Sequence, residues 1–131
     1  MATIKKFEDL EIWQTARKLS KGICPVLENL QESKNYKLKE QLDGSTGSVM
    51  DNIAEGFERD GNREFIQFLA ISKGSLGEVR SQLYRAYDRK ALNENELNEF
   101  QIMCGELAGK IAKFMFYLNN TNYKGNKYKN N

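Results

Sequence analysis

Histidine is absent from this sequence of 131 residues. Its absence removes the commonest general base, the Ser-His-Asp and Cys-His nucleophile systems, and most zinc sites. It also excludes the di-iron sites of helical bundles that use Glu-x-x-His pairs. No GxxxxGK[ST] stretch occurs, so the sequence has no P-loop for nucleotide phosphates. We therefore expect no enzymatic activity, no cofactor, no metal and no small-molecule substrate.

Proline and cysteine are also scarce. Proline occurs once, at Pro25, so long helices have few interruptions, and a kink is expected at that point. The two cysteines, Cys24 and Cys104, have no CxxC spacing. A disulfide between them is one interpretation, but we favour two reduced, partly buried thiols in a cytosolic protein.

Long apolar runs and a strong charge imbalance are missing as well. No run approaches the ~20 residues that span a bilayer, and the N-terminal residues lack the apolar stretch of a signal peptide. We therefore expect a cytoplasmic protein with no membrane partner. Lys and Arg total 20 against 18 Asp and Glu, a net charge of +2. Proteins that coat nucleic acid are usually far more basic, so this balance neither demands nor excludes such a partner.

The sequence is rich in apolar residues spaced three and four apart, in four segments. This periodicity predicts helices over about residues 9–30, 36–57, 62–90 and 93–118. Asn62 is expected to cap the third helix, and Asn93 with Glu96 forms a capping-box pattern before the fourth. Short connections force neighbouring helices to run antiparallel. The sequence thus predicts an all-α, antiparallel up-down four-helix bundle, one domain over residues 1–119, and a polar, disordered tail over 120–131.

Small residues interrupt the two middle helices, at residues 44–48 and 72–77. Each glycine costs about 1 kcal/mol against alanine inside a helix. The first stretch superficially resembles a glycine-rich phosphate loop, but it lacks the lysine and the preceding strand. We interpret both stretches as patches that let the two helices pack closely.

Two carboxylates on the middle helices, Glu55 and Glu78, are candidates to face each other near Asn52 and Gln82. Such a pair could serve as an acid/base pair or as a magnesium site. It could also form a hydrogen-bonded polar layer that fixes the helix register. We favour the polar layer.

Charge is unevenly divided between the middle helices. Residues 32–60 carry four basic and seven acidic residues, a net −3, whereas residues 61–90 carry six basic and three acidic residues, a net +3. Arg63, Lys73 and Arg80 on the third helix, with Arg59 near its start, are candidate contacts for RNA or DNA phosphates. The alternative, which we favour, is a solvated face that pairs with the acidic second helix.

Some strings go beyond generic bundle patterning. The most specific are Asn52-Ile53-Ala54-Glu55-Gly56 and, later, Gly74-Ser75-Leu76-Gly77-Glu78; Phe7-Glu8-Asp9-Leu10 with Ile12-Trp13-Gln14 opens the chain. In this order the strings resemble the four-helix-bundle family encoded in intervening sequences of bacterial 23S rRNA genes. The resemblance covers about residues 7–118.

The resemblance implies a ring-like homopentamer with no known enzymatic activity. It also implies a role in assembly, direct or through fixing the helix pair, for Asn52, Glu55, Gly56, Ser75 and Glu78. More distantly similar are the accessory variability proteins of retroelements, pentamers that bind nucleic acid through basic surfaces. After Gln-Leu the family usually has basic residues, whereas here stand Asp43 and Gly44, which leaves the third helix as the better candidate surface.

Three functional hypotheses follow from the sequence. The first is a non-enzymatic, homo-oligomeric scaffold or binding module that binds RNA or DNA through the basic third helix. The alternative is a protein–protein interaction module that binds no nucleic acid. An enzyme or metal protein is the third, and the missing histidine argues against it.

Overall fold

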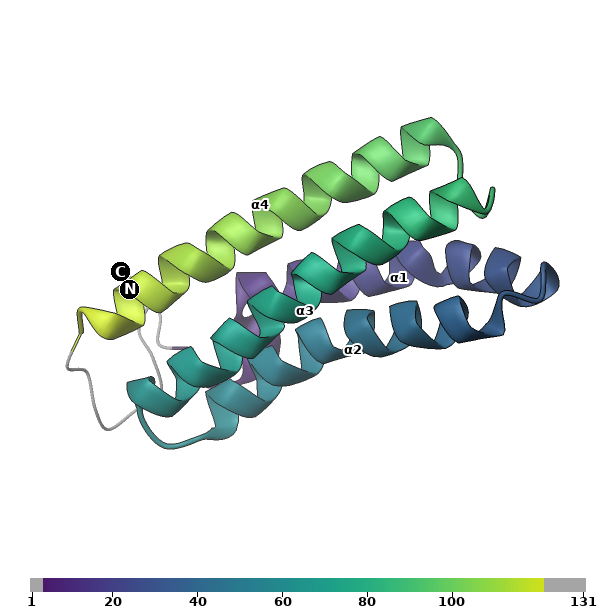
Figure 1. Cartoon of the computed structure of the whole chain (residues 1–131). Coiled ribbons are helices and arrows are strands. Elements are labelled where there is room, and N and C mark those ends of the chain that lie inside the picture. The colour runs from purple at the N-terminus through teal and green to yellow at the C-terminus, as the bar shows by residue number, and fades with distance from the viewer. Residues whose placement is uncertain (1–3, 122–131) are drawn as a thin grey trace.

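Four long helices build the protein, as the periodicity predicted. The computed structural model describes residues 4–121, so most of the predicted tail, residues 122–131, lies outside the described part. Each helix contacts the next one along the chain, and the last contacts the first, in an antiparallel up-down arrangement (Figure 1). The predicted all-α four-helix bundle is confirmed. Its elements are η1 (Phe7–Asp9), α1 (Glu11–Glu32), α2 (Tyr36–Glu58), α3 (Asn62–Asp88) and α4 (Glu94–Asn119).

One apolar core is shared by all four helices. The buried side of α1 shows how the sequence builds it, because its core residues follow one another at spacings of four and three: Ile12, Ala16, Leu19, Ile23, Val26 and Leu30. The helix continues through Pro25, which is exposed. At one end of the core, Phe65 makes edge-on contacts with Phe57 and Phe114, at ring-centroid distances of 6.1 and 5.4 Å. Aromatic pairs in this geometry add to the stability that burial provides.

The most extensive contact is between α2 and α3. Serine side chains make hydrogen bonds across it: Ser72 Oγ donates to the Val49 carbonyl at 2.8 Å, and the Ser48 and Ser75 hydroxyls pair at 2.8 Å. Small polar side chains therefore lie along this contact, which we call the α2–α3 seam. Each of these three hydroxyl oxygens therefore has at least one hydrogen-bond partner at the helix contact.

The close approach at the seam does not depend on the glycines that the sequence suggested. A Cβ added at Gly44, Gly47, Gly74 or Gly77 would meet no heavy atom within 4 Å. The prediction that these small-residue stretches bring α2 and α3 together is confirmed, but the contact is made by the serines and not by the glycines. The close contact lies instead at Gly56, where an added Cβ would come within 2.8 Å of Phe68 Cβ.

The helix starts confirm one predicted cap and correct another. Asn93 Oδ1 accepts from the Glu96 backbone N–H at 2.8 Å, and Glu96 Oε1 accepts from the Asn93 N–H at 2.9 Å, which completes the capping box of α4. The cap of α3 is Gly61, with φ +92°, rather than Asn62. Asn62 Nδ2 donates to the Leu118 and Thr121 carbonyls, so it ties the start of α3 to the end of α4.

Candidate nucleic-acid interface

The four cations singled out in the sequence do not form one stripe. Arg59 caps the end of α2, where it pairs with Glu55 at 3.1 Å and lies over the Phe68 ring at 5.0 Å. Arg63 is the second residue of α3, at the same end of the bundle. Lys73 lies near the middle of α3 and Arg80 two turns further on. The structure therefore separates Arg59 and Arg63 from the other two.

Lys73 and Arg80 share a face of α3 that borders α4. Arg80 Nε donates to Gln101 Oε1 on α4 at 2.9 Å, and Gln101 Nε2 donates back to the Arg80 carbonyl at 2.9 Å. Because Gln101 is neutral, this contact does not offset the positive charge of Arg80. Neither Lys73 nor Arg80 makes an ion pair within residues 4–121. Tyr84, one turn beyond Arg80, is 50% exposed on this side.

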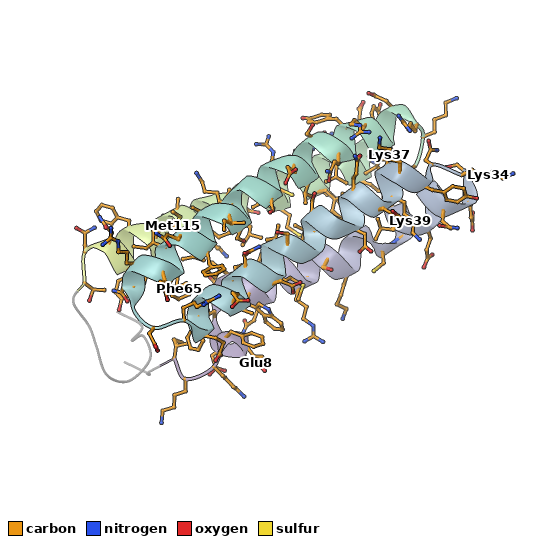
Figure 2. The ribbon with its side chains drawn as sticks, turned by 60° about the horizontal axis from the view of Figure 1, so that its bottom comes forward. Glu8, Lys34, Lys37, Lys39, Phe65 and Met115 are labelled. Atoms are coloured by element: carbon orange, nitrogen blue, oxygen red, sulfur yellow. The ribbon has the colours of Figure 1, made fainter. Side chains whose placement is uncertain are left out.

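A stronger concentration of positive charge lies at the end of the bundle where α1 turns into α2 and α3 ends. The loop and start of α2 supply three lysines, which Figure 2 places together at the end opposite Phe65 and Met115. The last turn of α3 and the residues after it supply three more cations. We call this set the basic end; it consists of Lys34, Lys37, Lys39, Arg85, Arg89 and Lys90.

The two halves of the basic end are joined by hydrogen bonds. Arg85 Nη1 donates to Gln41 Oε1 at 3.1 Å, and Arg89 Nη1 donates to Asn35 Oδ1 at 2.8 Å. Both acceptors are neutral amides, so these contacts orient the guanidinium groups without cancelling their charge. None of the six cations forms an ion pair with a described residue.

The basic end also carries exposed aromatic side chains, Tyr36 at 49% and Tyr84 at 50% exposure. Exposed rings among cations are typical of surfaces that stack nucleic-acid bases while binding phosphates. This set was not among the contacts predicted from the sequence. The sequence does show three lysines close together between Lys34 and Lys39. Their proximity to Arg85 and Arg89, however, depends on the register between α2 and α3.

Three of the five motif residues from the family strings build the α2–α3 seam. Asn52 Nδ2 donates to both the carbonyl and the hydroxyl of Ser48 at 2.8 Å, and Ser48 in turn pairs with Ser75. Gly56 receives the side chains of Phe65 and Phe68. These residues therefore lie where α2 and α3 pack together.

The remaining two motif residues, Glu55 and Glu78, do not face each other. The Ser48–Ser75 pair sets the antiparallel register, which places Glu55 level with Phe68. Glu78 lies ten residues further along α3, a separation of about 15 Å along the helix axis. The predicted carboxylate pair is therefore wrong, both as an acid/base or magnesium site and as a shared polar layer.

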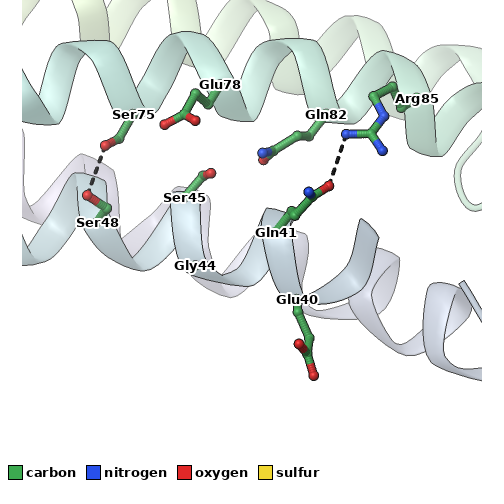
Figure 3. Close-up of a pocket in the computed structure, with 9 residues that line it drawn as sticks. All are labelled: Glu40, Gln41, Gly44, Ser45, Ser48, Ser75, Glu78, Gln82 and Arg85. Atoms are coloured by element: carbon green, nitrogen blue, oxygen red, sulfur yellow. Dashed lines mark hydrogen bonds between the residues drawn. The ribbon is translucent and has the colours of Figure 1, made fainter. Parts of the chain in front are cut away.

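An open pocket of about 510 Å³ lies on the α2–α3 seam beside the basic end (Figure 3). Polar side chains from both helices line it. Gln82 is one of them, only 8% exposed, and its Oε1 has no hydrogen-bond partner among the described residues. The lining residues are Glu40, Gln41, Gly44, Ser45, Ser48, Ser75, Glu78, Gln82 and Arg85.

The outward face of α4 carries exposed apolar side chains. Ile102 is 63% and Phe116 71% exposed, which makes them the most exposed of the large apolar side chains described. Gly105 and Gly109 lie between them at helical spacing, and a Cβ at either would meet nothing within 4 Å. A second helix could therefore approach the α4 backbone closely here.

The two cysteines are free, as favoured from the sequence. Cys24 is exposed and Cys104 is buried, so the expectation that both are partly buried was wrong for each. Burial raises the pKa of the Cys104 thiol from 9.0 to about 11, against the opposing effect of Arg80. Among residues 4–121, no helix has the length and apolar character needed to cross a membrane, and no three acidic or cysteine side chains group as metal ligands.

Comparison with known proteins identifies the family. The family model of the 23S rRNA-intervening sequence protein matches residues 8–113. A search of curated proteins found no match. The matched segment contains the seam residues Asn52, Gly56 and Ser75 and extends over most of the bundle. The chain therefore belongs to the family of 23S rRNA-intervening sequence proteins.

Proposed function

We propose that this protein is a non-enzymatic, homo-oligomeric scaffold that binds RNA or DNA. The basic end would be the main contact surface, and Lys73 and Arg80, on the side of α3 that borders α4, would add further phosphate contacts. The observation that carries the proposal is the meeting of six cations without ion pairs and two exposed tyrosines at one end of the bundle. The proposed interface thus still includes residues of the third helix, but Arg59 and Arg63 are not part of it.

Electrostatics explains why such a surface would bind nucleic acid when the chain as a whole is nearly neutral. Each cation that neutralises a phosphate releases a condensed counterion, and this release favours binding at low salt. The net charge of +2 is a sum over the whole chain, in which the acidic residues of α2 offset the cations of the basic end. Within the basic end, Arg85 and Arg89 are held by neutral amides, so less side-chain entropy would be lost on binding.

Fluorescence anisotropy with labelled single-stranded RNA and duplex DNA would test the proposal over about 50 to 200 mM salt. Lys37→Ala and Arg89→Ala should each weaken binding and lower the slope of log K against log salt by about 1. Arg63→Ala, at the other end of the bundle, is the matched control and should leave the slope unchanged. If neither probe binds at the lowest salt, the proposed nucleic-acid role is refuted.

The outward face of α4 supports the oligomeric part of the proposal. Exposed Ile102 and Phe116 flank glycines that leave the backbone accessible, and burying such side chains in a second copy would remove apolar surface from water. Light scattering should report a mass above that of one chain of 15.1 kDa. Phe116→Glu should lower that mass, whereas Glu58→Gln on α2 should not. A wild-type mass of one chain at micromolar concentration would refute assembly.

The same α4 face supports the second candidate, a protein–protein interaction module that binds no nucleic acid. The two candidates differ in one measurable respect. An interaction module would assemble through α4 yet show no salt-dependent binding of either nucleic-acid probe.

A further inference from the structure

The pocket on the α2–α3 seam holds a buried acceptor that lacks a donor. Gln82 projects from α3 into the pocket (Figure 3), and its Oε1 is buried with no hydrogen-bond partner in residues 4–121. A buried carbonyl oxygen without a donor costs free energy that a methionine or leucine at this position would avoid. The orphan oxygen therefore points to a donor that arrives from outside the chain.

Two further acceptors lie in the same part of the pocket. Glu78 is one turn before Gln82 on α3, and its carboxylate forms no ion pair or hydrogen bond with a described residue. Ser45, on α2, projects between them in Figure 3, and its hydroxyl is likewise without a partner in residues 4–121. A carboxylate, an amide oxygen and a hydroxyl together form a site for a group with several N–H donors.

Among the described residues, the lining of the pocket carries two carboxylates, Glu40 and Glu78, and one guanidinium group, Arg85. The cation that lines the pocket, Arg85, is bound to Gln41 and lies seven residues from Glu78, about 10 Å along the axis of α3. That distance is about one Debye length at physiological ionic strength, so Arg85 offsets Glu78 only weakly.

We propose that this pocket binds a guanidinium or primary ammonium group. Glu78 would supply the charge, Gln82 Oε1 would accept one N–H, and Ser45 would accept another. A guanidinium offers five donors in a plane and an ammonium three, so either can satisfy the buried oxygen and the carboxylate together. The group can come from a free small cation or from an arginine or lysine side chain of a second copy of this chain.

Titration with agmatine, which carries both groups, tests the free-cation source. In ¹H–¹⁵N spectra, saturable shifts are expected at Ser45, Glu78 and the Gln82 side-chain amide. Glu78→Gln and Gln82→Met should each raise the agmatine Kd roughly tenfold or more, as the loss of a charged or buried hydrogen bond implies. Glu64→Gln is the matched control, because it makes the same charge change on α3 outside the pocket, and it should leave the Kd unchanged.

Light scattering on the same variants tests the other source. If a side chain of a second copy fills the pocket, agmatine will compete poorly, and Glu78→Gln will lower the mass of the wild-type assembly while Glu64→Gln will not. Either local agmatine binding or this mass change supports the proposal. The proposal is overturned if agmatine causes no saturable local shift and Glu78→Gln leaves the mass unchanged, and melting curves of both variants will show that each is folded.

Discussion

Replacing Gly56 with alanine should destabilise the protein, although alanine is the better helix former. Gly56 is buried in the last turn of α2. A Cβ there would lie 2.7 Å from Phe65 Cδ1 and 2.8 Å from Phe68 Cβ, against about 3.5–4.0 Å for favourable carbon contacts. Phe68 Cβ is fixed to the backbone, and the Phe65 ring is held edge-on against Phe57 and Phe114. The helices must therefore separate.

The size of the effect follows from two opposing terms. The alanine gains about 1 kcal/mol of helix propensity. Against this, overpacking a tight site costs about 1–3 kcal/mol and more where backbone must shift. Because both close contacts have to be relieved, we expect a cost of about 2–4 kcal/mol, and therefore a net loss of about 1–3 kcal/mol in the free energy of unfolding. Gly47→Ala in the same helix has no heavy atom within 4 Å of the new Cβ, so it should stabilise by about 0.5–1 kcal/mol.

Urea unfolding followed by circular dichroism would measure both variants against the wild type. The midpoint should move down for Gly56→Ala and up for Gly47→Ala, with little change in the slope of the transition. Measurement at two protein concentrations separates protomer stability from assembly. If Gly56→Ala is as stable as Gly47→Ala, the close contact between the end of α2 and the start of α3 is not as described.

Three further outcomes are expected. Because the pKa of the Cys104 thiol is raised from 9.0 to about 11 by burial, against the opposing effect of Arg80, the folded protein holds this proton more tightly than the unfolded chain. The resulting stabilisation should be full below pH 9 and fall by about 2–3 kcal/mol as the pH rises to 11; Cys104→Ala should lack this fall and Cys24→Ala should keep it in urea unfolding at each pH. Asn93→Ala should lower the free energy of unfolding by about 1 kcal/mol through loss of the capping box, whereas Asn95→Ala should not. Gln82→Met should raise it by about 1 kcal/mol in the absence of ligand, since it removes the orphan oxygen; an unchanged or lower melting temperature would contradict that.

The fold was predictable because periodicity decides which residues are buried, and burial decides how the helices pack. The spacing of Ile12, Ala16 and Leu19 is sufficient to orient α1. Helix ends came within two residues because Asn93 and the short loops mark them. Asn62 misled the prediction: its side chain bonds to the end of α4, a contact that depends on tertiary structure alone.

The candidate site was less predictable, because it depends on the register between two helices. Arg89 and Asn35 are 54 residues apart in sequence, and the basic end exists only where they meet. The same register separates Glu55 from Glu78. Composition also marked the small-residue stretches correctly without showing which members point inward, and at the seam it is the serines that do so.

The α2–α3 seam has a consequence for the uniqueness of the fold. An apolar interface between two helices tolerates sliding by a turn, because one layer of leucines resembles the next. Here a slide by one turn would break the Ser48–Ser75 hydrogen bond and the bond from Ser72 Oγ to the Val49 carbonyl. It would also place Phe68 against a residue with a side chain, where Gly56 now has none. The seam therefore favours a single register between α2 and α3. Only in that register do the cations of the two helices lie at the same end of the bundle.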